Sequence, residues 1–120
     1  MFSRLDTLIV RVRDLRAARD WYATALGLAA TYVDETQGLA VLALDGTSLT
    51  LWQLDPGAGS AATGAGAYPI FAVENAAAAR AHLQARGVAA EALQTAPGVR
   101  YFGFHDPDGN RLEACEVVAG

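Results

Sequence analysis

Three charged side chains interrupt strand-like, mostly apolar segments and are the first candidates for chemistry. Arg11 lies within the segment 5–12, and Arg111 and Glu113 lie within the segment 111–117. A charge in the middle of an apolar strand is costly unless it is paired. We therefore expect Arg111 and Glu113 to pair with each other or with Arg11. Arg11 could instead bind an anionic group of a ligand or form a salt bridge to a second copy of the chain. The salt bridge is slightly favoured.

Three aromatic residues, Trp52, Tyr68 and Tyr101, also lie in or beside strand-like segments. Their flat faces and polar tips suit stacking against a planar ligand. The same side chains could instead fill a core or pack between two copies of the chain. The sequence favours neither interpretation.

The other reactive residue types are scarce. The chain has two histidines and one cysteine. His82 falls within a polar helical stretch and is expected to face solvent, and His105 precedes a turn and is expected to pack or hydrogen-bond locally. Cys115 has no His or basic group obviously placed to activate it, so we expect it to be inert.

Composition narrows the class of protein. A chain of 120 residues has the usual size of one domain. Its net charge of −4 and the lack of a run of Lys or Arg argue against a nucleic-acid surface. A lone cysteine cannot form an internal disulfide and fits a reducing compartment. No apolar segment approaches the ~20 residues that span a membrane. We expect a cytoplasmic protein without nucleic-acid or membrane partners.

Periodicity predicts a strand, a helix and three further strands in the first half of the chain. The first strand is expected at 5–12. Asp14 suits a helix N-cap and Gly27 a C-terminal cap, which places the helix between them. Strands are expected near 29–33, 38–44 and 48–54, with Asp45-Gly46 as a hairpin turn between the last two.

The second half repeats this order about 60 residues later. Strands are expected at 68–73, 88–93, 99–105 and 111–117, with a turn at 106–109. A helix is expected at 76–85, between Asn75 and Gly87. We therefore expect one domain, 1–120, made of the modules 1–55 and 68–120. The Gly-, Ala- and Ser-rich segment 56–67 suits a flexible connector better than a phosphate loop, because no Lys-Ser or Lys-Thr follows it.

Two stretches have a distinctive order of residues. One opens the first helix with Val12-Arg13-Asp14-Leu15, followed by Ala18, Trp21-Tyr22 and Leu26-Gly27-Leu28. The other reads Phe104-His105-Asp106-Pro107-Asp108-Gly109-Asn110-Arg111-Leu112-Glu113. Over nearly its whole length the chain resembles the vicinal oxygen chelate superfamily of glyoxalase, bleomycin-resistance and extradiol dioxygenase-like proteins. The resemblance implies an α+β fold in which two βαβββ modules form a cup-shaped mixed sheet with the helices outside. It also implies a homodimer.

In this family a divalent metal is bound on the inner face of the cup. The resemblance places its four ligand positions at Thr7, Thr50, Tyr68 and Glu113, of which only Glu113 is a standard ligand. A catalytic zinc usually needs three Cys, His, Asp or Glu ligands, and non-haem iron needs two His and a carboxylate. We therefore expect no resident metal or other cofactor. A divalent metal ion held by Glu113 is the alternative.

Strand alternation extends the inner face from these positions. The inward residues that could bind a ligand are Thr7, Arg11, Thr50, Trp52, Tyr68, Tyr101, Arg111 and Glu113. The resemblance adds that Arg11 matches a glyoxalase I arginine that holds a substrate carboxylate. The expected function is metal-free binding of a small, aromatic or planar molecule, as in bleomycin-resistance-like proteins. A metal-dependent lyase, isomerase or dioxygenase using Glu113 is one alternative, and a module used only for dimerisation is another.

Overall fold

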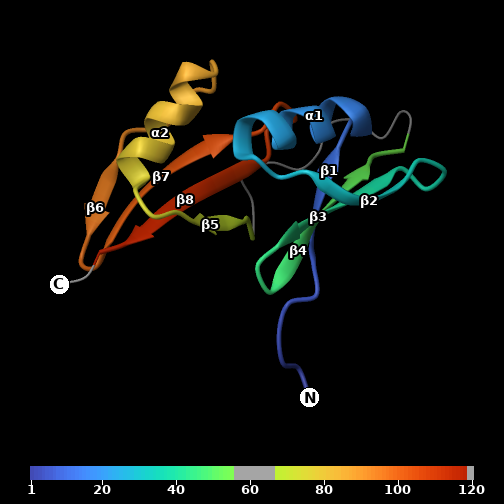
Figure 1. The fold of residues 1–120 in the computed structure, drawn as a ribbon, viewed down its shortest axis with the longest axis horizontal. Coiled ribbons are helices and arrows are strands. Elements are labelled where there is room, and N and C mark those ends of the chain that lie inside the picture. The colour runs from blue at the N-terminus through green and yellow to red at the C-terminus, as the bar shows by residue number, and fades with distance from the viewer. Residues whose placement is uncertain (56–66, 119–120) are drawn as a thin grey trace. The chain divides into compact units, whose positions relative to one another are not determined.

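The computed structural model describes residues 1–55 and 67–118, and each of these two ranges forms a compact unit (Figure 1). Each unit contains one helix and four strands in the order βαβββ. The predicted α+β class with two such modules is thereby confirmed. The predicted connector 56–67 lies almost wholly outside the described residues and stays a prediction. No helix in the described ranges is long and apolar enough to cross a membrane.

The first unit consists of β1 (Leu8–Val12), α1 (Leu15–Leu26), β2 (Ala30–Asp34), β3 (Leu39–Leu44) and β4 (Thr47–Gln53). Its sheet has the strand order β1-β4-β3-β2. The strand β1 runs parallel to β4, and the other neighbours are antiparallel.

The sheet of the first unit has one buried and one open face. The helix α1 packs on β3 and β4. Side chains of one parity are buried, as in Val10, Val12, Leu49 and Leu51. The opposite parity includes the exposed Ile9, Arg11 and Trp52 on the same two strands. This alternation is what a half-covered sheet produces, since successive side chains point to opposite faces.

The second unit consists of β5 (Ile70–Ala72), α2 (Ala76–Ala85), β6 (Gln94–Ala96), β7 (Val99–His105) and β8 (Arg111–Val117). Its strand order, β5-β8-β7-β6, repeats that of the first unit, again with the outer pair β5 and β8 parallel. The core under α2 is formed by Leu83, Phe102, Phe104, Leu112 and Ala114.

Both helices begin with the same two hydrogen bonds. Asp14 and Asn75 are the predicted N-caps, and their side chains accept from backbone N–H groups three residues on, each at 3.0 Å. A second acceptor comes from the last strand of each unit. Gln53 accepts from the Leu15 N–H at 2.8 Å, and Glu116 accepts from the Ala76 N–H at 2.9 Å. Two of the otherwise unpaired N–H groups at each helix start are thus satisfied.

The strand predicted at 88–93 is wrong. Within that segment Ala90 makes only an isolated bridge to Phe104, and β6 begins at Gln94. A turn that was not predicted precedes β7, and Gly98 in it has φ +80°. This turn lets 94–96 pair with β7. The other predicted strands agree within three residues, and the predicted bounds of α2, β7 and β8 are confirmed.

The capping role of the last strands can be tested by removing their acceptors. Gln53→Ala and Glu116→Ala should each lower the free energy of unfolding by about 1 kcal/mol, because one part-buried N–H at the helix start loses its partner. Urea denaturation measures the change. Gln84→Ala, on the exposed side of α2, is the matched control and should change stability by less than about 0.5 kcal/mol. Equal losses in all three variants would contradict the assignment.

Candidate functional site

The four predicted ligand positions occupy matching places in the two units. Thr50 of β4 lies in register with Ile9 of β1, and Glu113 of β8 lies in register with Ile70 of β5. Thr7 and Tyr68 each lie two residues before those isoleucines. The resemblance therefore identified equivalent positions, and the side chains there can be compared unit by unit.

In the first unit the pair consists of two hydroxyls that bind each other. The Thr7 and Thr50 Oγ1 atoms are 2.7 Å apart, and Thr7 Oγ1 also lies 3.2 Å from the Ser48 carbonyl oxygen, to which it can donate. Thr50 is buried. Neutral hydroxyls are weak ligands for a divalent ion, and these two are already satisfied within their own sheet.

In the second unit Glu113 is held by an arginine. Arg111 Nη2 lies 3.0 Å from Glu113 Oε2, which confirms the predicted pairing of these two residues. Only 9% of the Glu113 side chain is exposed to solvent. A carboxylate with so little contact with water requires a compensating charge or hydrogen bonds, and Arg111 supplies both.

A second carboxylate, that of Glu91, binds the same guanidinium. Arg111 Nη1 lies 3.0 Å from Glu91 Oε2, and Arg111 Nη2 lies 3.2 Å from Glu91 Oε1. The hydrogen bonds from Arg111 hold the pKa of Glu91 below its ordinary value, although partial burial opposes this. Hydrogen bonds to Glu91 and then to Glu113 raise the pKa of Arg111. The guanidinium therefore stays charged between two carboxylates.

Glu91 is not among the site residues predicted from the sequence. It lies in the apolar segment 88–93, where the argument that a charge in such a segment needs a partner would have identified it. Its partner Arg111 lies on β8, twenty residues along the chain, so the pair could not be predicted from the sequence. We call Glu91, Arg111 and Glu113 the ionic triad.

The backbone around Glu91 is fixed on two sides. Arg80 of α2 donates from Nε to the Glu91 carbonyl at 2.7 Å and from Nη2 to the Ala90 carbonyl at 3.3 Å. The Glu91 N–H donates to the Gly103 carbonyl at 2.9 Å. Gly103 also leaves room for the triad, because a Cβ atom there would collide with Arg111 Nη2 and Glu91 Oε1.

One aromatic candidate of the second unit, Tyr68, lies beside the triad. The Arg111 guanidinium lies 5.3 Å from the centroid of the Tyr68 ring, within range of a cation–π interaction. Tyr68 is 40% exposed. The half-buried Tyr101 has its hydroxyl 3.5 Å from Gln94 Oε1. His105 is in register with Arg111 and exposed, so it does not pack in the core.

Arg11 and Trp52 form a related contact in the first unit. Arg11 donates to the carbonyls of Trp52 at 3.2 Å and Gln53 at 3.3 Å, and its guanidinium lies 5.4 Å from the Trp52 ring centroid. Trp52 is 36% exposed. The structure thus places Arg11 against its own sheet, and the two predicted partners for it, a ligand anion and a second copy, stay predictions.

These residues do not fit the divalent metal of the family. In the described parts of the chain no three His, Cys, Asp or Glu side chains gather in a geometry that could hold a metal ion. The one standard ligand, Glu113, already binds a guanidinium. A metal ion on the same carboxylate would sit close to that positive charge, and like charges at such distances repel strongly where water is scarce.

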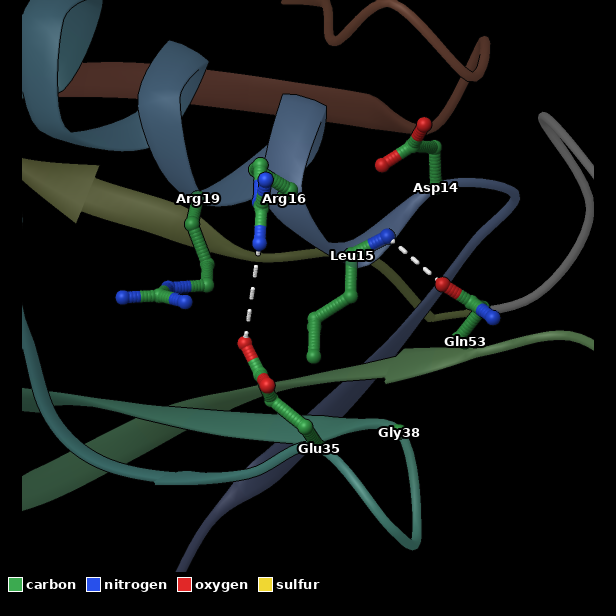
Figure 2. Close-up of a pocket in the computed structure, with 7 residues that line it drawn as sticks. All are labelled: Asp14, Leu15, Arg16, Arg19, Glu35, Gly38 and Gln53. Carbon is green, nitrogen blue, oxygen red and sulfur yellow. Dashed lines mark hydrogen bonds and ion pairs between the residues drawn. The ribbon is translucent and has the colours of Figure 1, made fainter.

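A pocket of about 200 Å³ lies elsewhere in the first unit, between the start of α1 and the β2–β3 turn (Figure 2). Its wall contains two arginines, Arg16 and Arg19, and two acids, Asp14 and Glu35. Arg16 Nη2 and Glu35 Oε1 are 4.0 Å apart and both side chains are largely exposed. None of the predicted site residues lines this pocket.

A sequence model of one protein family matches residues 4–114, and its description is the glyoxalase/bleomycin resistance protein/dioxygenase superfamily. The chain belongs to this superfamily. Its fold and the resemblance seen in its sequence agree with this assignment. A search of curated protein sequences finds no match.

Solved structures of the superfamily fold match the chain over nearly its whole length. TnmS3, an antibiotic binding protein from Streptomyces sp. CB03234, is 27% identical, with 97% of each chain covered and a TM-score of 0.78. The protein ATC0852 from Agrobacterium tumefaciens is 26% identical, covering 98% of this chain and 100% of its own, with a TM-score of 0.77. A lactoylglutathione lyase from the same species is 22% identical, covers 95% and 93%, and has a TM-score of 0.74.

The role of Gly103 as the space for the triad can be tested by Gly103→Ala. The added methyl group should displace the Arg111–Glu91 pair and lower the free energy of unfolding by about 1–3 kcal/mol, as overpacking does. In a Glu91→Ala background the same change should cost clearly less, because one of the two colliding groups is gone. Urea denaturation of the four proteins gives the coupling between the sites. Strictly additive losses would contradict the assigned role.

Proposed function

We propose that the chain is a small-molecule binding protein that works without a catalytic metal and takes a planar or aromatic ligand beside its exposed aromatic side chains. The observation that carries this proposal is the ion pair between Arg111 and Glu113. It occupies the position at which a metal-dependent relative needs an available carboxylate. A guanidinium in that place can bind and orient a ligand, but it cannot lower the pKa of a bound water as a metal ion does.

The aromatic side chains support a flat ligand. Trp52 and Tyr68 are both more than a third exposed, although residues of these types usually bury most of their surface. Each ring has an arginine guanidinium within 5.4 Å of its centroid. A flat ring beside a hydrogen-bonding cation is the combination that fixes both the plane and the polar edge of an aromatic molecule.

The comparison with TnmS3 supports the same class of function. That protein is an antibiotic binding protein, and its likeness to this chain extends over 97% of both. Its identity of 27% is above that of the lactoylglutathione lyase, which at 22% bears on the fold alone. The likeness favours a binding protein over an enzyme of the lyase type.

The alternative is a metal-dependent lyase, isomerase or dioxygenase that uses Glu113 as ligand or base. Such an enzyme would first have to release Glu113 from Arg111. Breaking this nearly buried contact between a guanidinium and a carboxylate costs free energy. The metal content of the protein, purified without chelator, separates the two functions.

Ligand binding can be followed with 2-hydroxymethylanthraquinone, a neutral planar probe. We expect it to quench the fluorescence of Trp52 in a saturable manner. Trp52→Phe should lose most of the quenching, and Trp21→Phe, the matched control at the half-buried tryptophan of α1, should retain it. Trp52→Ala should weaken binding about 3- to 10-fold, the value of one aromatic stacking contact.

Either of two results would overturn the proposed function. The first is the absence of quenching by this probe and by related planar molecules. The second is a near-stoichiometric metal in the purified protein that is lost in Glu113→Ala.

A further inference from the structure

We propose that Arg111 is the cationic centre of the ligand site and that it binds a carboxylate on the planar ligand, which replaces Glu91. This inference rests on the proposed function and specifies the chemical class of its ligand. Glu91 then acts as an internal occupant of the site, held on Arg111 until a ligand arrives.

The two carboxylates of the triad differ in how easily they can leave Arg111. Glu113 belongs to the strand β8 and its side chain is 9% exposed. Glu91 lies outside the strands, between α2 and β6, and its side chain is 46% exposed. Glu113 therefore fixes the guanidinium, and Glu91 is the partner that can exchange with a group from solvent.

The contact with Glu91 shows which chemical group the exchangeable position accepts. Two N–H groups of Arg111 meet the two oxygens of one carboxylate at 3.0 and 3.2 Å. This two-pronged geometry matches planar oxygen anions and is a frequent mode of carboxylate recognition by arginine. A ligand carboxylate can take the same two donors without any change in Arg111.

The exchange needs no rearrangement of the backbone. Arg80 and Gly103 hold the main chain at Glu91 through hydrogen bonds that do not involve its carboxylate. Only the Glu91 side chain has to turn into solvent, and ion pairs as exposed as this one contribute little free energy. The Tyr68 ring beside the guanidinium offers a surface for the aromatic part of the same ligand.

The experiment compares three anthraquinones that differ in one substituent: the 2-carboxylate, the neutral 2-hydroxymethyl compound and the cationic 2-aminomethyl compound. Titration calorimetry gives the Kd of each. In the unaltered protein we expect the carboxylate to bind most tightly and the cation most weakly.

Variants then identify the group that competes. Glu91→Gln should tighten binding of the carboxylate about fivefold, the value of one exposed ion pair, and leave the neutral compound unchanged. Glu74→Gln is the matched control, since it removes the same charge from an exposed position of the second unit and should change neither Kd. In the double variant Arg111→Gln with Glu113→Gln, the affinity for the anthraquinone carboxylate should fall to that for the neutral compound.

The outcomes separate this inference from the proposed function. The inference is overturned and the proposed function stands if the neutral compound binds as tightly as the carboxylate. The same holds if Glu91→Gln weakens binding of the carboxylate, or changes its Kd no more than Glu74→Gln does. Tightest binding of the cation also overturns it, because the two acids would then be the recognition groups. If no anthraquinone binds, both fail. Glu91→Gln changes only a half-exposed side chain, so the result does not depend on the double variant being folded.

Discussion

A carboxylate that is almost excluded from water cannot stay charged unless a positive group or several hydrogen bonds compensate it. Glu113 meets this condition through Arg111, two residues along the same strand. The arrangement of the second unit depends on this contact. The guanidinium is held in place by Glu113, a second acid attaches to its remaining donors, and residue 103 on the next strand has no side chain that would fill the same space.

The two units show how one backbone can carry different chemistry. Thr50 and Glu113 occupy the same register point, and so do the residues that pair with them on the parallel edge strands. In one unit the position is filled by a hydroxyl bound to another hydroxyl, and in the other by an acid bound to a base. Neither arrangement leaves an unpaired anionic ligand of the kind that a divalent metal requires. The repeated hydrogen bonds at the helix starts show that the framework is the same in both units, although the site side chains are not.

The sequence was sufficient for most of the fold because the relevant signals are local. The turn residues at 106–109 marked the boundary between β7 and β8, and the N-cap residues Asp14 and Asn75 marked the helix starts. The strand predicted at 88–93 is wrong because the turn at Gly98 determines which residues pair with β7, and these are residues 94–96. The apolar composition of 88–93 does not reveal this turn.

The site was less predictable, because its contacts join residues that are distant in the sequence. Arg111 and Glu113 are neighbours on one strand face, so their pairing followed from their spacing. The link from Glu91 to Arg111 spans twenty residues, and Arg80 approaches the same segment from a helix. Arg11 donates to the backbone carbonyls of Trp52 and Gln53, at the end of the adjacent strand. Because every residue has a backbone carbonyl, residue types could not predict these acceptors.

The central claim is that Arg111, and not a metal ion, is the cation bound to Glu113. Paramagnetic broadening by Mn²⁺ in heteronuclear NMR spectra tests it most directly, because the effect is large only within a short distance of the ion. Our account predicts that substoichiometric Mn²⁺ leaves the signals of Glu113 and of its neighbours Ile70 and Gly103 no broader than those of other residues. Selective loss of these signals, abolished by Glu113→Ala, would contradict it.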